Sequence, residues 1–555
     1  MSKRTAGEDE QSTEQYSFKN RQRADNGKNS TPMKADDQPS DFEDEFSDEF
    51  SSEDEVFEAG VDGRPDADLE AEKRDAMEVD QDTFMPGRHK LEAGQSLAPD
   101  ASAYEMLHTL SMPWPCLSFD ILHDDLGEGR KTYPATMYSV AGTQADTRRA
   151  RENQILVMKM SSLSRVEKSR EEEDSDDDSV DDEDGQDGGD PILETKSIPM
   201  NSTTNRIRTH RFAQADSLSS PKTLTATMTE SAELVIHDIT PHLASFDTAG
   251  TVITPSQSQP LSTLKPHGSR EGYAVAWSPL ISTGKILSGD QQGRIFASSP
   301  GDGNSGGGGK WVSDTRPYTS HTASVEDISW SPSERNVFAS ASADGTVKVW
   351  DIRSKSRKPA VDVQISATDI NVLSWSKLTQ HLLATGDDDG EWAVWDLRAW
   401  KPAAGATNTQ PKPQSVASFS FHKEQITSIE WHPNDDSIIA VAAGDNTVTL
   451  WDLAVELDDE ESRDTAGVED VPPQLLFVHY METVKECHWH AQIPGVIMAT
   501  GLNGLGRSAF DQLFEELPQS DHAQKIEGIF SLKPMLPTGV WRRKLTVFLK
   551  LLSSG

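Results

Sequence analysis

Three stretches of this chain decide its fold. They read VFASASADGTVKVWD (337–351), LLATGDDDGEWAVWD (382–396) and IIAVAAGDNTVTLWD (438–452). In each, an apolar strand leads into a tight turn rich in Asp, and a second strand ends in Trp-Asp. This arrangement predicts a β-hairpin, because Asp-Gly and Asp-Asn pairs tolerate the positive φ angles that such turns require.

The same pattern recurs along most of the chain. Leading tryptophans stand at positions 277, 330, 375, 431 and 489, at spacings of 45 to 58 residues. Repeats of this length are typical of β-propellers, whose small sheets are stable only when neighbouring sheets pack on them. We therefore predict an all-β, seven-bladed β-propeller, with six blades as the alternative. The expected blades are 132–165, 191–240, 262–299, 318–354, 362–400, 416–454 and 474–505, with 117–122 completing the last one.

Acid-rich segments precede and interrupt the repeat. Residues 1–99 cannot bury enough apolar area to offset their ordering entropy, so we expect them to be disordered. Between 171 and 190, 13 of 20 residues are acidic and none is basic. The expected organisation is a disordered acidic region (1–99), an N-terminal helix and ring-closing strand (100–123), the propeller (124–505) with an acidic insertion (166–190), and an atypical C-terminal tail (506–555).

The charge balance limits the kinds of partner. The chain has 52 basic and 92 acidic residues, and its formal net charge is −40. Such a protein repels nucleic acid and anionic membranes and attracts basic proteins, although dispersed acid also serves solubility alone. Only two cysteines, Cys116 and Cys487, are present, and there is no secretory signal or apolar run of ~18 residues. We expect a cytosolic or nuclear protein.

Several segments resemble one known family. YEMLHTLSMPWPCLSFDIL (104–122) and EDVPPQLLFVHYMETVKECHWH (469–490) resemble the histone-binding WD-repeat group. Within that group, the acidic head and insertion, with MYSVAGTQA and HTASVEDISWSP, look most like the glutamate-rich, ribosome-assembly WD-repeat proteins. The resemblance covers roughly 100–503. It does not extend to the tail, where Ala509 replaces the aromatic residue expected 20 positions after Trp489.

The resemblance implies a function. It implies a non-enzymatic scaffold of the nucleus and nucleolus that shuttles to the cytoplasm and acts in large-subunit ribosome biogenesis. Its partners would be pre-ribosomal particles and a basic ribosomal protein, large-subunit protein number three, for which it is a dedicated chaperone. The alternative is a histone-binding chaperone or chromatin scaffold. A substrate adaptor of a ubiquitin ligase, or an enzyme, is the third class considered. We expect a monomer with no cofactor, no direct nucleic-acid contact and no membrane contact.

The resemblance also implies a partner-binding groove. It would lie between a helix around 104–110, which the apolar spacing before the Pro-rich stop also predicts, and an acidic loop ending at two prolines. Basic side chains of the partner would face the loop carboxylates. The alternative is that the loop is only a long, solvent-exposed connection between two strands. The expected partner-binding residues are Tyr104 and Leu107 on the helix, Glu456, Asp458, Asp459, Glu460, Glu461, Asp464, Glu469, Asp470, Pro472 and Pro473 in the loop, and Glu171, Glu172, Glu173, Asp174, Asp176, Asp177 and Asp178 in the insertion.

A further set of residues is expected to be structural. In WD repeats, a His, a Ser or Thr, the turn Asp and the closing Trp form a hydrogen-bonded set. The resemblance assigns His321, Ser340 or Ser342, Asp344 and Trp350 to this set. Trp395 and Trp451 are the closing tryptophans of later copies.

Other motifs do not predict catalysis or a cofactor. The residues 301–306 match G-x-G-x-x-G, but no helix N-terminus is expected after them, so we predict a loop. His479, Cys487, His488 and His490 lie near one another, but we expect no zinc site because zinc requires about four convergent ligands and a strand would bring only two of these to one face. Three serines precede acidic residues, a context that acidophilic kinases favour; they are Ser52, Ser175 and Ser179.

Overall fold

The computed structural model describes seven stretches of the chain: 103–166, 190–212, 221–248, 250–301, 309–401, 413–455 and 471–501. It also describes the backbone of strands at 95–99, 524–532 and 549–553. The chain divides into two units, 1–70 and 71–555, and the described residues belong to the second. Most of the acidic head (1–94), most of the acidic insertion and the loop 456–470 lie outside the described residues, as do the three candidate phosphorylation sites, whereas the end of the head, 95–99, is a strand.

Six antiparallel sheets are each built from consecutive strands, and we number them as blades 1 to 6. Blade 1 contains β3 (Cys116–Leu122), β4 (Ala135–Thr143), β5 (Gln154–Leu163) and β6 (Ile192–Pro199); blade 2 contains β7 (Thr204–Phe212), β8 (Lys222–Thr229), β9 (Leu234–Asp238) and β10 (Ser262–Leu264). Blade 3 contains β11 (Val275–Trp277), β12 (Ile286–Gly289), β13 (Arg294–Pro300), β14 (Trp311–Ser313) and β15 (Tyr318–Thr319); blade 4 contains β16 (Val325–Trp330), β17 (Val337–Ser342), β18 (Thr346–Asp351) and β19 (Val361–Gln364). Blade 5 contains β20 (Ile370–Trp375), β21 (Leu382–Asp387), β22 (Trp392–Asp396) and β23 (Ala417–Phe419); blade 6 contains β24 (Ile426–Trp431), β25 (Ile438–Ala443), β26 (Thr447–Asp452) and β27 (Leu475–Tyr480).

A composite sheet occupies the remaining place in the ring. Its strands are β28 (Val484–Trp489), β29 (Val496–Gly501), β30 (Gln524–Leu532) and β2 (Tyr104–Met112), in the order β2-β30-β29-β28. We expected seven blades, but six are formed from consecutive strands, and this sheet joins the two ends of the sequence. Strand β30 comes from the tail, to which the family resemblance does not extend. A separate two-stranded sheet pairs β1 (Gln95–Pro99) with β31 (Leu549–Ser553).

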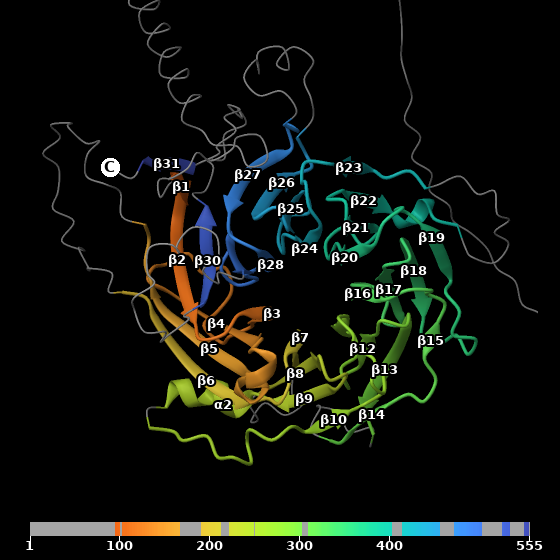
Figure 1. Ribbon diagram of the computed structural model, residues 1–555, viewed down its shortest axis with the longest axis horizontal. Helices are drawn as coiled ribbons and strands as arrows, with labels where there is room; N and C mark the ends of the chain where they lie inside the picture. Colours follow the sequence, from red (N-terminus) through yellow and green to blue (C-terminus); the bar gives the residue numbers. More distant parts are fainter. Residues whose placement is uncertain are drawn as a thin grey trace, which may run out of the picture. The chain divides into compact units, whose positions relative to one another are not determined.

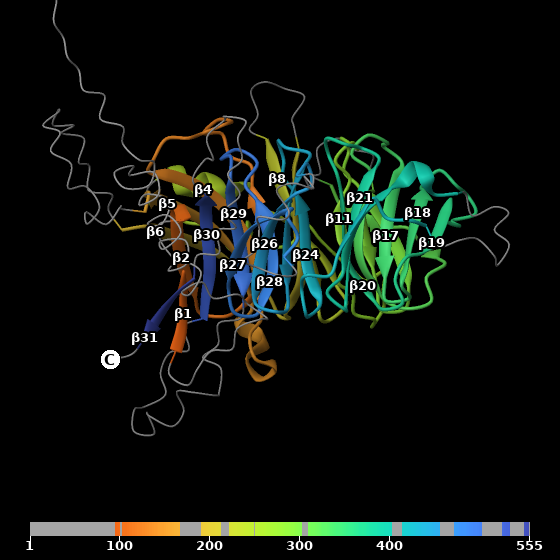
Figure 2. The same cartoon turned by 90° about the horizontal axis from the view of Figure 1, so that it is seen from above.

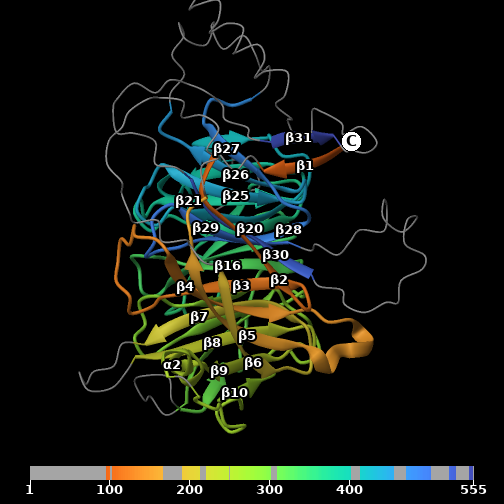
Figure 3. The same cartoon turned by 90° about the vertical axis from the view of Figure 1, so that its left-hand side faces the viewer.

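The sheets follow one another around a ring. The inner strands β3, β7, β11, β16, β20, β24 and β28 are in contact in that order, and β28 in turn contacts β3. Figure 1 looks down this ring, and Figures 2 and 3 show its strands from the side. Helices are few among the described residues: α2 (Thr240–Asp247) and the 3-10 turns η2 (Thr147–Glu152) and η4 (Leu397–Ala399). No helix in the described part of the chain has the length and apolarity needed to cross a membrane.

The segment expected to form the N-terminal helix is a strand. In β2, Tyr104, Met106, Leu110 and Met112 are buried while residues between them are more exposed, so the burial alternates as on a sheet. Pairing with β30 overrides the weak helical spacing. The expectation that 117–122 completes the last blade was also wrong, because β3 is the inner strand of blade 1 and β2 pairs in the composite sheet.

The leading tryptophans connect neighbouring sheets. Each ends an inner strand and is buried, and four of them donate an indole N–H hydrogen bond to a carbonyl oxygen on the preceding inner strand. The bonds run from Trp277 to Arg208 at 2.9 Å, Trp330 to Ala276 at 3.2 Å, Trp431 to Ser374 at 3.1 Å and Trp489 to Glu430 at 3.1 Å. A buried indole needs such a partner, and this explains why Trp recurs at that position of the repeat.

An ionic network joins the composite sheet to blades 1 and 2. Glu486 on β28 is 1% exposed. Its carboxylate accepts hydrogen bonds from Arg206 at 2.7 Å and Arg208 at 2.5 Å, both on β7, and from the backbone N–H of Phe119 on β3 at 2.9 Å. Burial opposes ionisation, but the two guanidinium groups hold the pKa of Glu486 well below its usual range. The ring is thus closed by a buried carboxylate that bonds to three partners.

His488 extends this network toward blade 6. Its Nδ1 lies 2.9 Å from a carboxylate oxygen of Glu430 on β24, and its Nε2 lies 3.6 Å from Glu486. Burial lowers the pKa of His488, but the two carboxylates outweigh burial and raise it to about 9. The imidazolium therefore lies between two carboxylates at the closure of the ring.

Replacement of the central carboxylate should destabilise the protein. Glu486→Gln removes a buried carboxylate from between two half-buried guanidinium groups, which costs roughly 3–5 kcal/mol of unfolding free energy. Urea unfolding followed by tryptophan fluorescence measures this loss. The exposed Glu194→Gln is the control and should shift the free energy by less than about 0.5 kcal/mol. Equal urea midpoints for Glu486→Gln and the unaltered protein would contradict this account of ring closure.

Stability should also depend on the protonation of His488. Because its folded pKa of about 9 exceeds the ordinary value of 6.5, the stabilisation is complete below pH 6.5 and is lost as the pH rises through 9. The difference corresponds to about 3 kcal/mol. Unfolding free energies measured between pH 6.5 and 9.5 should fall in the unaltered protein and stay flat in His488→Gln. A parallel fall in both proteins would show that other groups are responsible.

Candidate site for a basic partner

The hydrogen-bonded set of the repeat is complete in blade 4. His321 Nε2 lies 2.7 Å from Ser340 Oγ, and His321 Nδ1 lies 3.0 Å from Asp344. The indole N–H of Trp350 donates to the same Ser340 oxygen at 2.8 Å. Burial opposes ionisation of Asp344, but the bonds from His321 and Thr346 hold its pKa below the usual value. Of the two serines considered, Ser340 takes this place, while Ser342 bonds to a backbone carbonyl.

Blades 3 and 6 contain the same His-Asp pair. In blade 3, His267 lies 2.9 Å from Asp290. In blade 6, His422 lies 3.0 Å from Asp445, and Trp451 donates to Thr449 at 2.8 Å. Despite burial, these histidines hold the pKa of both aspartates below the usual value. The turn Asp of each of these blades therefore has an internal partner.

Blade 5 lacks the histidine. Trp395 still donates to Thr385 at 2.8 Å, but the turn Asp387 bonds to the hydroxyl of Ser366 at 2.9 Å and to two backbone N–H groups of its own turn. Asp387 is 8% exposed, and burial raises its pKa. It forms no ion pair with any described residue. A cationic group from outside the chain would therefore relieve this burial cost.

A pocket of about 460 Å³ opens at Asp387. Two exposed carboxylates of the same turn, Asp389 and Glu391, line it and have no described ion-pair partner. Lys423 is the one Lys or Arg in the lining, and His422 is already bonded to Asp445. The lining residues are Ile365, Ser366, Ala367, Asp387, Asp389, Glu391, Ser420, His422 and Lys423. The surplus of carboxylates suits a guanidinium or ammonium group.

The pocket lies at a defined end of the ring. Its residues come from the turn after the second strand of blade 5 and from the loops that lead into β20 and β24. In an antiparallel sheet, loops after the second and fourth strands lie at the same end. The pocket is therefore on the face of the ring that carries these loops.

The described residues of the expected partner-binding groove do not line this acidic pocket. Tyr104 is 2% exposed, and its hydroxyl lies 2.7 Å from His479 Nδ1, so it packs in the core. Leu107 is half-buried against the same core cluster. Pro472 and Pro473 are half-buried before β27. The expected helix is absent from this position, and the acidic residues of the loop and of the insertion lie outside the described residues.

Comparison with known proteins identifies the family. Residues 94–164 match the family model of the histone-binding protein RBBP4, which also describes a component of the CAF1 complex, and 313–351 and 413–452 match "WD domain, G-beta repeat". The chain is 43% identical over 474 residues to the ribosome assembly protein rrb1 of Schizosaccharomyces pombe, covering 85% of this chain and 92% of that protein. The chain belongs to the glutamate-rich, ribosome-assembly WD-repeat family.

Two further relatives extend this family. The protein HEAT STRESS TOLERANT DWD 1 of Arabidopsis thaliana is 41% identical over 461 residues, which are 78% of this chain and 92% of the relative. The glutamate-rich WD repeat-containing protein 1 of Dictyostelium discoideum is 39% identical over 432 residues, 76% and 83% of the two chains. The resemblance inferred from the sequence is thereby confirmed, as is the all-β WD-repeat propeller.

Other candidate motifs do not form a site. Among the described residues there is no group of three His, Cys, Asp or Glu side chains placed to hold a metal ion. His479 bonds to Tyr104, and His488 bonds to Glu430. The G-x-G-x-x-G stretch is followed by strand β14 and not by a helix.

Sequence reasoning missed the pocket of this WD-repeat protein. The signal was available in the comparison of the three hairpins. A His stands 23 residues before the turn Asp in blades 4 and 6, whereas Ser366 holds that place before the aligned Asp389 of blade 5, and Asp387 replaces Ser342 and Ala443 of the other two hairpins. Because we expected the repeats to be uniform, we predicted partner-binding carboxylates only in the long acidic segments.

The turn aspartates should differ in their contribution to stability. Asp344→Asn removes a charge-assisted bond to His321 and should cost about 1.5–3 kcal/mol. Asp387→Asn removes a carboxylate with no cationic partner and should change the unfolding free energy by less than about 1 kcal/mol. Urea unfolding of the two variants measures the difference, with Asp445→Asn as a second His-paired control. Equal losses in all three variants would show that Asp387 is partnered in solution.

Proposed function

We propose that this protein is a non-enzymatic scaffold that acts in assembly of the large ribosomal subunit. It binds a newly made basic ribosomal protein, large-subunit protein number three, and shields its positive charge until the protein enters a pre-ribosomal particle. It works as a monomer in the nucleus and nucleolus, shuttling to the cytoplasm. It makes no direct contact with nucleic acid.

The observation that carries this proposal is the unpaired carboxylate Asp387 in an acidic pocket. A buried carboxylate without a counter-ion gains most from an Arg or Lys of a partner, since the desolvation cost is already present. The net charge of −40 raises the encounter rate with any strongly basic protein. The name of the Schizosaccharomyces pombe relative, a ribosome assembly protein, supports a ribosomal partner in particular.

The acidic segments would extend this contact. The loop carboxylates between 456 and 470 and those between 171 and 178 would attract further basic residues of the same partner. Because each long-range attraction is screened by salt, these segments would contribute mainly to the association rate. The pocket at Asp387 would contribute more to the lifetime of the complex.

A histone is the second candidate partner. The observation that favours it is the match of residues 94–164 to the histone-binding family model. Histones and ribosomal proteins are both rich in Lys and Arg, so the same pocket suits either. Only direct comparison of the two partners separates these functions.

The full-length protein should bind purified large-subunit ribosomal protein three more tightly than histones H3–H4. The double variant Asp389→Asn/Glu391→Gln should weaken this binding by roughly thirtyfold, because each of the two lost charge-assisted bonds is worth about 1 kcal/mol at a partly exposed site. Calorimetric titration at two salt concentrations measures both partners.

A matched control variant removes the same number of negative charges away from the pocket. Glu334→Gln/Glu194→Gln also neutralises two exposed carboxylates, and it should leave the affinity within about twofold. If the histones bound more tightly than the ribosomal protein, the histone would be the favoured partner. If both double variants bound the ribosomal protein equally, the pocket would not be the contact site.

A further inference from the structure

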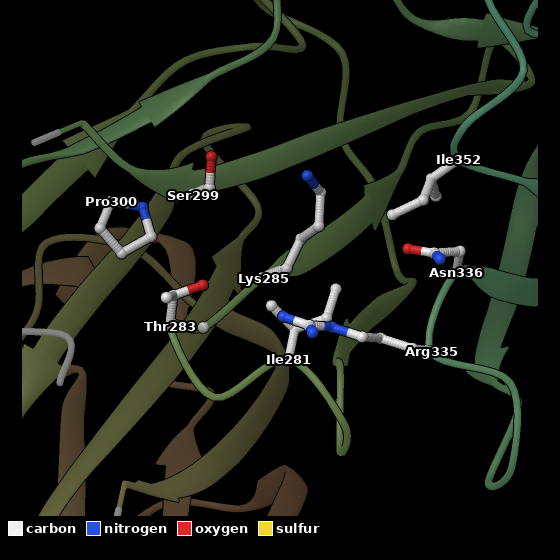
Figure 4. A pocket seen from close by; sticks show the side chains of 9 residues that line it. Ile281, Thr283, Lys285, Ser299, Pro300, Arg335, Asn336 and Ile352 are labelled. Atoms are coloured by element: carbon white, nitrogen blue, oxygen red, sulfur yellow. The ribbon is translucent and has the colours of Figure 1, made fainter. Parts of the chain in front are cut away.

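A second pocket of about 410 Å³ lies between blades 3 and 4. Its residues come from the loops after the first and third strands of these blades, so it opens on the face opposite the acidic pocket. In Figure 4, the side chain of Lys285 points to the space between Ser299 and Ile352, and the guanidinium of Arg335 ends beside Ile281 and Thr283. The lining residues are Ile281, Thr283, Gly284, Lys285, Ser299, Pro300, Arg335, Asn336 and Ile352.

The two cations of this pocket have no carboxylate partner. Neither Lys285 nor Arg335 forms an ion pair with a described residue, although acidic residues outnumber basic ones 92 to 52. Two other cations of the adjacent loops are paired, since Arg353 binds Asp351 through several hydrogen bonds and Arg357 binds Asp314, whereas Lys355 and Lys358 form no ion pair with a described residue and lie outside the pocket. The pocket also contains no carboxylate of its own. It is therefore a local positive site on a strongly negative protein.

The backbone around Lys285 is fixed. Its carbonyl oxygen accepts from Ser278 N–H at 2.8 Å, and the preceding Gly284 bonds to Ile281 at 2.8 Å in a turn with φ +87°. A Cβ at Gly284 would lie 2.8 Å from the buried ring of Trp311, so only glycine fits this turn. A preorganised loop lowers the entropy that binding must overcome.

We infer that this pocket binds a single phosphoryl group carried by a phosphorylated polypeptide. One phosphoserine has a charge of about −1.5 to −2 at pH 7, which the two cations match. The hydroxyls of Thr283 and Ser299 and the amide of Asn336 add neutral donors for the phosphate oxygens. Ile281 and Ile352 provide apolar contact for the adjoining peptide.

Polynucleotides fit this pocket less well. No aromatic side chain lines it, so a base has nothing to stack on. A strand of RNA would also bring many phosphates to a protein of net charge −40, whereas the pocket neutralises only one. This inference does not depend on the proposed function, because it concerns an anionic ligand on the other face.

The test uses the full-length protein and the peptide acetyl-Gly-Gly-pSer-Gly-Gly-amide. Binding is followed by phosphorus NMR and calorimetry, with inorganic phosphate and the unphosphorylated peptide alongside. The phosphopeptide should bind, and Lys285→Gln/Arg335→Gln should weaken it by about tenfold or more. The unphosphorylated peptide should not bind.

The control variant Lys355→Gln/Lys358→Gln removes two exposed positive charges outside the pocket. Its affinity for the phosphopeptide should equal that of the unaltered protein. Thermal unfolding of both variants checks that the fold is intact. Unchanged phosphopeptide binding by Lys285→Gln/Arg335→Gln would overturn the site. Binding of inorganic phosphate without the phosphopeptide, or displacement of the phosphopeptide by a single-stranded RNA of about ten nucleotides, would overturn the polypeptide ligand.

Discussion

The carboxylate of Glu486 is the interaction on which the closed ring depends. A ring built from successive sheets has one junction where the end of the chain must meet its beginning, and no local hairpin supplies it. Here β28 brings Glu486 against two arginines of β7 and the backbone of β3. The carboxylate is buried, so its bonds are strong and the loss of any partner is costly. His488 links the same junction to Glu430 of blade 6.

Several other junctions use a different contact, in which a leading tryptophan buries its ring and bonds to the preceding inner strand, as Trp330 does to Ala276. The junction of β20 with β16 instead uses a carboxylate of Asp327, which accepts from the backbone N–H of Leu373. The tryptophan contacts are neutral and repeat with the sequence. The ionic network stands where the repeat is interrupted, because the composite sheet draws its strands from both ends of the chain.

The two pockets differ in the charges that line them. In blade 5 the histidine partner of the turn aspartate is missing, and Asp387 is left with neutral donors in an acidic pocket. Between blades 3 and 4, Lys285 and Arg335 have no acidic neighbour in their pocket. The two pockets lie on opposite faces of the ring and have opposite charge. One face thus suits a basic partner, and the other suits an anionic group.

The sequence by itself determined the hairpins, the propeller and the acidic character, because alternating burial and Asp-containing turns are local signals. It also identified His321, Asp344 and Trp350, which interact within one blade. Only the tertiary structure decided that 104–112 is a strand, since its pairing with β30 joins residues over 400 positions apart. The partners of Glu486 and the unpaired state of Asp387 were likewise set by which inner strands and loops meet, and no local pattern records that.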